Sequence, residues 1–353
     1  MQHVVISLAT ANPDRYVTGK EVYDFLNSAY RLEPAEKQLY RKLLEDGPIK
    51  GRYIAIHHDQ YDAELNQDKL TELFAQAAKE MACKAACKAI DEAGCRLADI
   101  GAVVVNTCTG YLCPGLTSYI AEELKLQSST KVFDLMGMGC GGAIPNLEFS
   151  AAIGAADSDK MVLSLAVEVC SATLFRAPEP GLIVSNSIFA DGASAVIMGK
   201  QQKSAGKSLF KFVDFASEIF PEHREDLRYK TQHGKLRNVL TRRVPIIGAR
   251  AAAEVAGRLL KKNSLRIEDI DFWAVHPGGT EVLKQIGKKL GISKNDLRFS
   301  YEIFRGFGNM SSPSVMFVLK AILDKARPKA GHKGMVLSFG AGFSAYAALV
   351  EFL

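Results

Sequence analysis

The chain has 353 residues, of which 48% are hydrophobic and 24% charged, and a formal net charge of +5. That length suits two domains of about 150 to 200 residues. The small charge and the lack of a dense basic stripe with aromatic residues argue against a reader of duplex nucleic acid. No apolar run approaches the roughly 18 residues of a transmembrane helix. The N-terminus lacks the basic start and long apolar core of a signal peptide.

Seven cysteines are scattered along the chain, and their number is odd. This argues against the disulfide framework of a small secreted protein. The absence of a Cys-x-x-Cys pair argues against structural zinc. We therefore expect a cytoplasmic protein with no bound metal. The cysteines are Cys83, Cys87, Cys95, Cys108, Cys113, Cys140 and Cys170.

Predicted strands and helices alternate along the first half of the chain. A strand at residues 3–8 precedes an insert, residues 11–67, which holds helical stretches at 18–30 and 34–44. Short, almost wholly apolar strands in this half are typical of sheets covered on both faces. After the insert come an Ala-rich helix, three apolar strands and a closing segment, at residues 68–93, 103–105, 132–135, 161–167 and 182–200.

The second half repeats the plan of the first at an offset of about 170 residues. Residues 97–100 and 267–270 share the pattern aliphatic-x-Asp-Ile, and each precedes an apolar strand. Further matches at the same offset indicate an internal duplication. They pair the segments at 161–165 and 193–197 with those at 335–339 and 344–349.

Two α/β halves follow from this repeat, one over residues 1–200 and one over residues 207–353, with a polar linker at 201–206. The alternation of strands and helices predicts parallel-rich sheets covered by helices. We expect the functional site at the seam between the halves.

The first candidate for chemistry is Cys140. A strand at residues 132–135 leads through a Gly-rich turn into a helix that should begin near this cysteine. Free amide N–H groups and the positive end of the helix dipole would lower the pKa of the thiol and favour the thiolate. The same amides would hold an oxyanion during acyl transfer. Taken alone, the motif fits a small cysteine packed under a helix equally well.

His276 and Asn309 occupy similar turns in the second half. His276 follows the strand at residues 272–275, at the end where open α/β sheets place functional groups. A simple turn residue fits that position as well. Asn309 lies in a Gly-containing turn before a helix at 315–323, where helix capping is the simpler role.

The duplication brings these three residues together. Moved by the repeat offset, Cys140 falls on the turn at residues 309–310, so the helix N-termini that carry Cys140 and Asn309 should face each other across the seam. His276 lies on the neighbouring turn. A thiol, an imidazole and an amide in one cleft suit attack of a thiolate on a thioester. The imidazole and the amide would then donate hydrogen bonds to a developing enolate.

Together the motifs resemble those of type III polyketide synthases, the chalcone-synthase-like branch of the thiolase superfamily. The chain length is nearer that of the bacterial members. The resemblance rests on Gly-Cys-Gly-Gly-Ala at 139–143, His-Pro-Gly-Gly at 276–279 and Gly-Asn-Met-Ser-Ser at 308–312. Supporting matches follow the family order over nearly the whole chain. They lie at residues 107–110, 114–115, 168, 189–193 and 339–343.

The resemblance implies a duplicated thiolase fold with five αβαβα layers, and a homodimer. It also implies a decarboxylative Claisen condensation. Cys140, kept as a thiolate by an imidazolium at His276, would take an acyl group from a starter thioester. His276 and Asn309 would stabilise the enolate that malonyl thioester leaves on losing carbon dioxide. The substrates would be acyl-CoA and malonyl-CoA, with no other cofactor and no nucleic-acid or membrane partner. The cycle would repeat and end in a pyrone or a phenolic product.

The resemblance also assigns residues to the substrate. The aromatic that guards the junction of tunnel and cavity is Phe189. Cys108 and Cys113 line the cavity, the latter near the partner subunit. Lys42 would contact the phosphates of coenzyme A, and Gly278 belongs to the substrate-binding part of the His276 motif.

Several positions depart from the plant enzymes. A second guarding phenylalanine is replaced near Asn238, and Ala341 stands where those enzymes carry proline. Leu39 and Asp46 thin the basic cluster to which Lys42 belongs. Because a carrier protein would not need the same phosphate grip, an acyl carrier protein is an alternative donor. A single-round ketosynthase or acyltransferase is the alternative function. A non-catalytic partner of another condensing subunit is a third hypothesis, against which the retained catalytic residue types argue.

Overall fold

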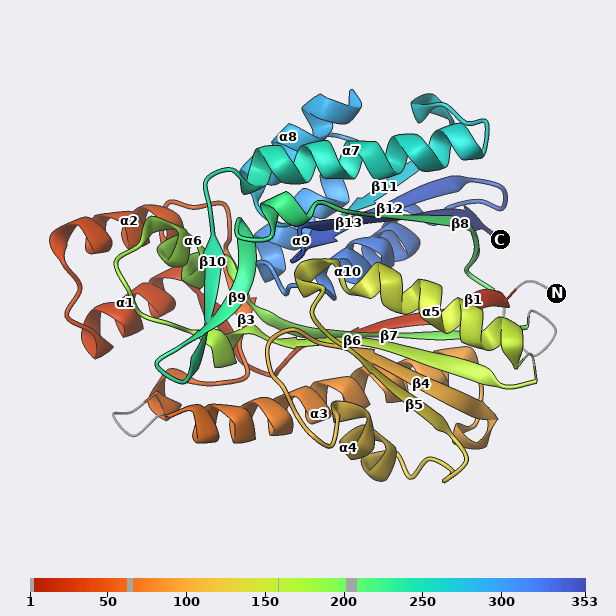
Figure 1. Cartoon of the computed structure of the whole chain (residues 1–353), viewed down its shortest axis with the longest axis horizontal. Helices are drawn as coiled ribbons and strands as arrows, with labels where there is room; N and C mark the ends of the chain where they lie inside the picture. The colour runs from red at the N-terminus through yellow and green to blue at the C-terminus, as the bar shows by residue number, and fades with distance from the viewer. Residues whose placement is uncertain (1–2, 62–65, 158, 201–207) are drawn as a thin grey trace.

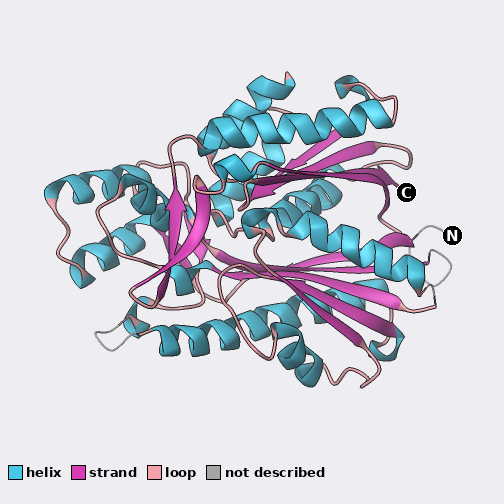
Figure 2. Ribbon diagram, viewed as in Figure 1, coloured by secondary structure: helices cyan, strands magenta, loops and turns pink. Residues whose placement is uncertain are grey.

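The structure, a computed structural model, describes residues 3–61, 66–157, 159–200 and 208–353. Its helices and sheets form five layers in the order helix, sheet, helix, sheet, helix (Figures 1 and 2). This is the predicted αβαβα architecture. The linker predicted at 201–206 lies outside the described residues, and the boundary between the halves stays a prediction.

Five strands from the first half form one sheet layer. Helix α3 (Gln67–Ala93) covers its outer face together with α4 (Leu116–Glu123). The alanines that make α3 unusual in the sequence are buried against the sheet, because small side chains let helix and sheet approach closely. In spatial order the strands are β1 (His3–Ala11), β7 (Asp191–Lys200), β6 (Met161–Val169), β4 (Ile100–Asn106) and β5 (Lys131–Leu135).

Four strands from the second half form the other sheet layer. Helices α7 (Val244–Lys262) and α8 (Thr280–Leu290) cover its outer face. The two layers are joined edge to edge, because β1 pairs with β8 through Val4 and Val5. From that joint outward, the strands are β8 (Phe210–Ile219), β13 (Ser344–Phe352), β12 (Lys333–Gly340) and β11 (Phe272–Val275).

The central layer consists of α5 (Ala143–Ala156) and α10 (Ser314–Ala321), with α9 (Arg298–Phe307) beside them. Residues of α5 and α10 belong to one buried apolar cluster that also includes strands of both sheets. A helix buried on all sides has no polar face, which agrees with the apolar sequence of α10. The turns that carry Cys140 and Asn309 lead into these two central helices.

The direction of the strands differs from the prediction. Of the eight pairings described in the nine-stranded sheet, three are parallel and five are antiparallel. The prediction of parallel-rich sheets is therefore wrong. An apolar strand covered on both faces has the same pattern in either direction, so the hydrophobic runs did not reveal that β7 and β13 return antiparallel to their neighbours.

The repeated segments form equivalent elements. Single 3₁₀ turns at Leu97–Asp99 and Ile267–Asp269 precede β4 and β11. The matched segments at 161–165 and 335–339 lie in β6 and β12, and those at 193–197 and 344–349 lie in β7 and β13. The duplication seen in the sequence is thus present in the fold.

A smaller unit lies at one end of the layers, at the left in Figure 1. The two helical stretches of the insert form α1 and α2, close to the predicted limits. The unit closes over the seam between the halves. No described helix is both long and apolar enough to cross a membrane. The unit comprises β2 (Tyr16–Thr18), α1 (Gly19–Ala29), α2 (Pro34–Leu44), β3 (Gly51–Tyr53), α6 (Pro180–Ile188), β9 (Leu227–Gln232) and β10 (Lys235–Leu240).

Candidate active site

The turn that carries Cys140 is held by contact with the end of β12. Gly139 has a φ of 56°, a left-handed conformation that favours glycine, and begins a 3₁₀ turn that ends at Gly141. Gly340 presses on this turn so closely that a Cβ there would lie 2.1 Å from the carbonyl oxygen of Met138 and 3.1 Å from the backbone nitrogen of Cys140. A strand end of the second half therefore positions the thiol of the first half.

His276 is placed by the same strand end. It follows β11, its N–H donates to the carbonyl of Leu337 on β12 at 2.8 Å, and the residue is 1% exposed. Its ring packs edge-on against Phe339, with the ring centroids 5.8 Å apart. Because Phe339 contacts the imidazole and the adjacent Gly340 contacts the Cys140 turn, the thiol and the imidazole lie at one point of the seam. No described residue is a hydrogen-bond partner of the buried His276 Nδ1.

Asn309 enters the site from the turn before α10. Its backbone is bonded on both sides of Phe189: the N–H of Asn309 donates to the carbonyl of Ile188 at 2.8 Å, and the carbonyl of Asn309 accepts from the N–H of Ala190 at 2.9 Å. Its side-chain oxygen accepts from the N–H of Ser311 at 2.8 Å. This leaves the amide nitrogen, which bonds to no described residue, as a donor for a substrate oxygen.

A buried carboxylate, Glu168 at the end of β6, organises the floor of the site. It is 0% exposed and accepts from the N–H of Cys108 at 2.9 Å and from the hydroxyls of Thr109 at 2.9 Å and Ser312 at 2.6 Å. The thiol of Cys108 lies 3.3 Å from the same carboxylate. Burial raises the pKa of Glu168 while these donors oppose the rise.

The protonation of the site differs from the prediction. Burial raises the pKa of Cys140 to about 12, although a hydrogen bond from Ser311 opposes the rise. Burial also lowers the pKa of His276 to about 3. The predicted lowering of the thiol pKa is therefore wrong. Helix α5 begins only at Ala143, so Cys140 lies in the preceding 3₁₀ turn and gains little from the helix N-terminus, while desolvation disfavours its charge.

The remaining predicted substrate residues fall into two groups. Cys108 lies in the thiol cluster of the site, and a Cβ on Gly278 would lie 3.4 Å from the His276 ring. Phe189 lies at the end of α6 and lines the adjoining cavity. Cys113 is exposed in the loop before α4, and Lys42 lies in a surface groove along α2, so neither reaches the catalytic residues of its own chain.

Two residues of the site had no predicted role. The hydroxyl of Ser311 donates to the thiol of Cys140 at 3.3 Å and lies 3.4 Å from the thiol of Cys108. Tyr229 of β9 is hydrogen-bonded to Thr173 at 3.3 Å, and burial, with a smaller contribution from the nearby cysteines, raises its pKa. The turn residues His233 and Gly234 between two short strands are the sequence signal that would have predicted the hairpin of β9 and β10, which carries Tyr229.

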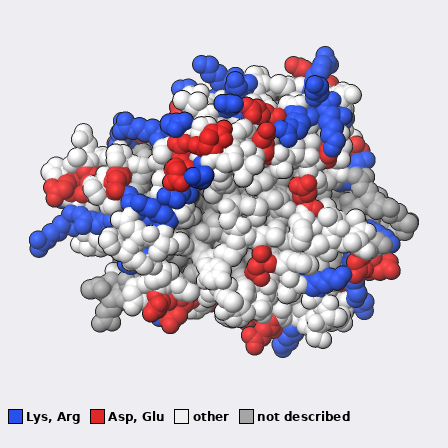
Figure 3. Space-filling model, viewed as in Figure 1, with Lys and Arg blue, Asp and Glu red and all other residues white. Residues whose placement is uncertain are grey.

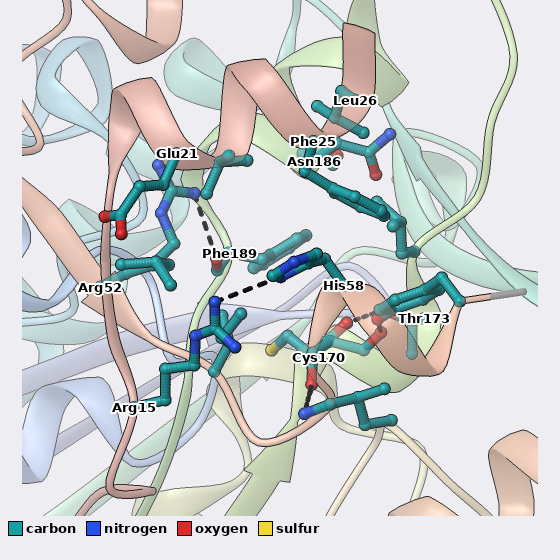
Figure 4. A pocket seen from close by; sticks show the side chains of 18 of the residues that line it. Arg15, Glu21, Phe25, Leu26, Arg52, His58, Cys170, Thr173, Asn186 and Phe189 are labelled. Carbon is teal, nitrogen blue, oxygen red and sulfur yellow. Dashed lines mark hydrogen bonds between the residues drawn. The ribbon is translucent and has the colours of Figure 1, made fainter. Parts of the chain in front are cut away.

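A cavity of about 490 Å³ lies beside Phe189, the residue whose neighbours bond to the backbone of Asn309 (Figure 4). Phe189 and Cys170 both line this cavity, and burial, together with the nearby carboxylates of Asp191 and Glu168, raises the pKa of the Cys170 thiol. Asn238 of β10 also lines the cavity. The described residues contain no cluster of three or more His, Cys, Asp or Glu side chains that would hold a metal ion.

Comparison with known proteins agrees with this geometry. Two sequence families match the chain: the chalcone and stilbene synthase C-terminal domain over residues 212–352, and FAE1/type III polyketide synthase-like proteins over residues 10–268. A 3,5-dihydroxyphenylacetyl-CoA synthase of Streptomyces toyocaensis is 31% identical over 93% of this chain and 81% of its own. The alpha-pyrone synthesis polyketide synthase-like Pks18 of Mycobacterium tuberculosis is 28% identical over 99% of this chain and 91% of its own.

Solved structures show the same fold. The polyketide synthase PKS-I of the brown alga Ectocarpus siliculosus aligns with a TM-score of 0.89 and 26% identity, over 100% of this chain and 98% of its own. A fungal type III polyketide synthase, ORAS, aligns over the full length of both chains with a TM-score of 0.91 and 23% identity. The agreement over the full length confirms the thiolase fold.

Proposed function

We propose how this chain, which belongs to the chalcone and stilbene synthase family of type III polyketide synthases, uses its buried site for decarboxylative condensation. Members of this family are acyltransferases. The observation that carries the proposal is the meeting of Cys140, His276 and Asn309 at the seam of the two halves.

The first step is acyl transfer to Cys140. His276, neutral in the resting site, takes the proton of the thiol as the sulfur attacks the carbonyl carbon of the starter thioester. The tetrahedral oxyanion collapses, the carbon–sulfur bond to coenzyme A breaks, and the imidazolium returns the proton to the leaving thiolate. The products are an acyl-Cys140 thioester and free coenzyme A.

The second step is decarboxylation of malonyl thioester. The bond to the carboxylate breaks, carbon dioxide leaves, and the electron pair forms an enolate. The free amide nitrogen of Asn309 and a ring N–H of His276 donate to the enolate oxygen. The enolate carbon then attacks the acyl carbon on Cys140 and the carbon–sulfur bond to Cys140 breaks. Cys140 leaves as a thiolate and regains its proton from solvent, and the product is a chain longer by two carbons. Repetition and ring closure give a pyrone or a phenolic product.

The test is malonyl-dependent release of carbon dioxide. Purified enzyme with an acyl-CoA and malonyl-CoA is expected to release carbon dioxide and to form a product detected by mass spectrometry. Cys140→Ala must abolish the condensed product, and Asn309→Leu must lower decarboxylation while acylation of Cys140 persists. Consumption of acyl-CoA without any release of carbon dioxide would overturn the proposal.

Coenzyme A is the donor that the surface favours over a carrier protein. The groove along α2 is lined by Lys37, Arg41 and Lys42, and neither lysine forms an ion pair with a described residue. These cations suit the phosphates of coenzyme A despite Asp46 in the same groove. The charge reversal Lys42→Glu is expected to raise the KM for acyl-CoA. A lower KM for acyl carrier protein than for acyl-CoA would favour the single-round alternative.

A homodimer formed through β5 is the expected assembly. β5 is the edge strand of the sheet, and Val132 on it and Phe149 on α5 are exposed. Figure 3 shows the molecule from the same side as Figure 1. Few charged side chains lie in the middle of this face, where Figure 1 shows α5. An unpaired apolar edge is stabilised by pairing with a second copy. Sedimentation should give a dimer, and Val132→Lys should give monomers.

We further propose that the enzyme acts in the cytoplasm with no cofactor besides its coenzyme A substrates. The chemistry needs neither redox change nor a metal, since a thiol, an imidazole and an amide supply nucleophile, base and enolate donors. Activity that survives exhaustive dialysis against a chelator would support this. Activity restored only by an added metal or organic cofactor would contradict it.

A further inference from the structure

Arg52 is a buried cation whose charge no carboxylate of the described chain balances. It lies on β3, is 2% exposed, and burial lowers its pKa to about 10, so the guanidinium stays protonated at neutral pH. Tyr16 is the titratable group that acts on it. A buried charge without a counterion is costly, and proteins normally pair such a group.

One edge of the Arg52 guanidinium has no hydrogen-bond partner among the described residues. Its Nη1 donates to the carbonyl of Phe189 at 3.2 Å, whereas Nε and Nη2 have no hydrogen-bond partner among the described residues. Nε and Nη2 lie on one edge of the guanidinium, and this edge binds a carboxylate through two parallel hydrogen bonds. The unfilled edge therefore matches an anionic oxygen pair.

The charged neighbours of Arg52 are already engaged. Glu21 of α1, beside Arg52 in Figure 4, accepts from the N–H and hydroxyl of Thr18 at 2.7 and 2.8 Å in the helix cap. Asp24 forms an ion pair with Lys20 at 2.6 Å. Both carboxylates line the cavity, yet neither forms an ion pair with Arg52.

The cavity at which Arg52 lies suits an acyl chain. Apolar side chains of α1, including Val22, Phe25 and Leu26, line one wall. Phe189 lines the cavity as well, and the residues on either side of it are hydrogen-bonded to the backbone of Asn309. Figure 4 shows Arg52 on the α1 side of this cavity, across from Cys170 and Thr173. A chain attached to Cys140 that passes Phe189 would thus have methylene contacts along its length and a cation at its far end.

From this arrangement we propose that the cavity binds acyl groups that end in a carboxylate, with the Nε and Nη2 edge of Arg52 as the recognition element. The proposal rests on the proposed function, because the acyl group reaches the cavity from Cys140. Because both nitrogens are buried, the carboxylate would bind inside the cavity, between Arg52 and the side chains of α1 that line it. Arg52 is then a specificity-determining residue for the starter.

Matched starters test the proposal on the wild-type enzyme. Octanoyl-CoA and the CoA thioester of the eight-carbon dicarboxylic acid differ only in their far end. Acylation of Cys140, followed by intact-protein mass spectrometry, should proceed about ten- to a hundredfold more efficiently with the carboxylated chain, as expected for charge-assisted hydrogen bonds. Equal or better use of octanoyl-CoA overturns the proposal even if no variant folds.

Variants separate recognition from a structural role. Arg52→Met should remove the preference for the carboxylated chain, so that the ratio of the acylation rates with the two starters falls to about one. Parallel losses with both starters would instead mean that Arg52 only positions Phe189. The matched control is Arg15→Gln, since Arg15 lines the same cavity but is already bonded to His57 and His58 at 3.0 and 3.2 Å. This control should keep the wild-type preference.

Binding without catalysis keeps this proposal distinct from the proposed function. In a Cys140→Ala background, calorimetry should show tighter binding of octanoate than of octanol, and Arg52→Met should abolish the difference. If the two ligands bind alike, the cavity does not recognise carboxylates. If octanoate is preferred but no thioester acylates wild-type Cys140, the carboxylate-binding site is supported and the proposed reaction is refuted.

Discussion

Ser311 donates a hydrogen bond to the thiol of Cys140 across 3.3 Å and thereby joins the two halves of the site. This bond lowers the pKa of the thiol against the rise caused by burial. Ser311 has a φ of 58°, which residues with a side chain seldom adopt, so the fold maintains a strained backbone in order to aim this hydroxyl.

Removal of this hydroxyl should slow acylation. Ser311→Ala is expected to lower the rate of Cys140 acylation about tenfold, the effect of roughly one hydrogen bond on the barrier. The pKa of the thiol should rise further, since the bond stabilises the thiolate. Single-turnover mass spectrometry measures the rate. Ser312→Ala is the control, because Ser312 donates to Glu168 at 2.6 Å. Equal rates in both variants would contradict the assignment.

The pH dependence of Cys140 alkylation should reveal a shared proton. With pKa values of about 12 for Cys140 and about 3 for His276, the pair stays neutral overall between these limits. Transfer of the proton from Cys140 to His276 leaves the total number of protons on the pair unchanged, so the fraction of thiolate formed in this way does not depend on pH. The rate with iodoacetamide should therefore be flat from about pH 5 to pH 9.

The matching variant is His276→Gln. Without the base, the thiolate forms only by loss of the proton to solvent, so the alkylation rate should rise about tenfold for each pH unit below the thiol pKa. A wild-type profile that rises in the same way would show that His276 does not take the proton.

The contact between Gly340 and the turn that carries Cys140 should be essential for acylation of Cys140. In Gly340→Ala the new Cβ would lie 2.1 Å from the carbonyl of Met138, so the turn must shift and the thiol with it. We expect acylation to fall by at least about tenfold and the melting temperature to drop. The control is Gly257→Ala in α7, where a Cβ meets nothing within 4 Å and helix propensity improves. Full activity in Gly340→Ala would refute this role.

Tyr229 should limit the length of the product. Its hydroxyl is hydrogen-bonded at 3.3 Å to Thr173, which lines the cavity. Tyr229→Ala is expected to permit at least one further malonyl extension, visible by liquid chromatography with mass spectrometry. Tyr229→Phe keeps the volume and should keep the product. An unchanged product from Tyr229→Ala would mean that other residues limit the number of extensions.

The sequence predicted those features of the site that depend on local patterns. Gly-rich turns after apolar strands placed Cys140, His276 and Asn309 at strand ends, and the repeat offset brought the first and last together. The five-layered fold followed from the resemblance and the duplication. These inferences held because glycine turns and buried strands have signatures within a few residues.

Other features depend on contacts between distant segments. The raised pKa of Cys140 arises from burial by both halves, which the residues around it do not encode. Arg52 reads as an ordinary surface arginine in the sequence, and only the packing of β3 against β2, α9 and β7 shows that it is buried. The hydrogen bond between Tyr229 and Thr173 likewise joins segments that lie far apart in the sequence.

The backbone pairing of Asn309 with the residues flanking Phe189 constrains how this enzyme can diversify. A deletion, insertion or proline near Phe189 would break the hydrogen bonds that fix the catalytic amide. New starter preferences at this junction are therefore accessible through exchange of side chains on an unchanged main chain. A directed-evolution library that varies side chains at 189 and keeps loop length constant should retain turnover, whereas one that varies loop length should lose it.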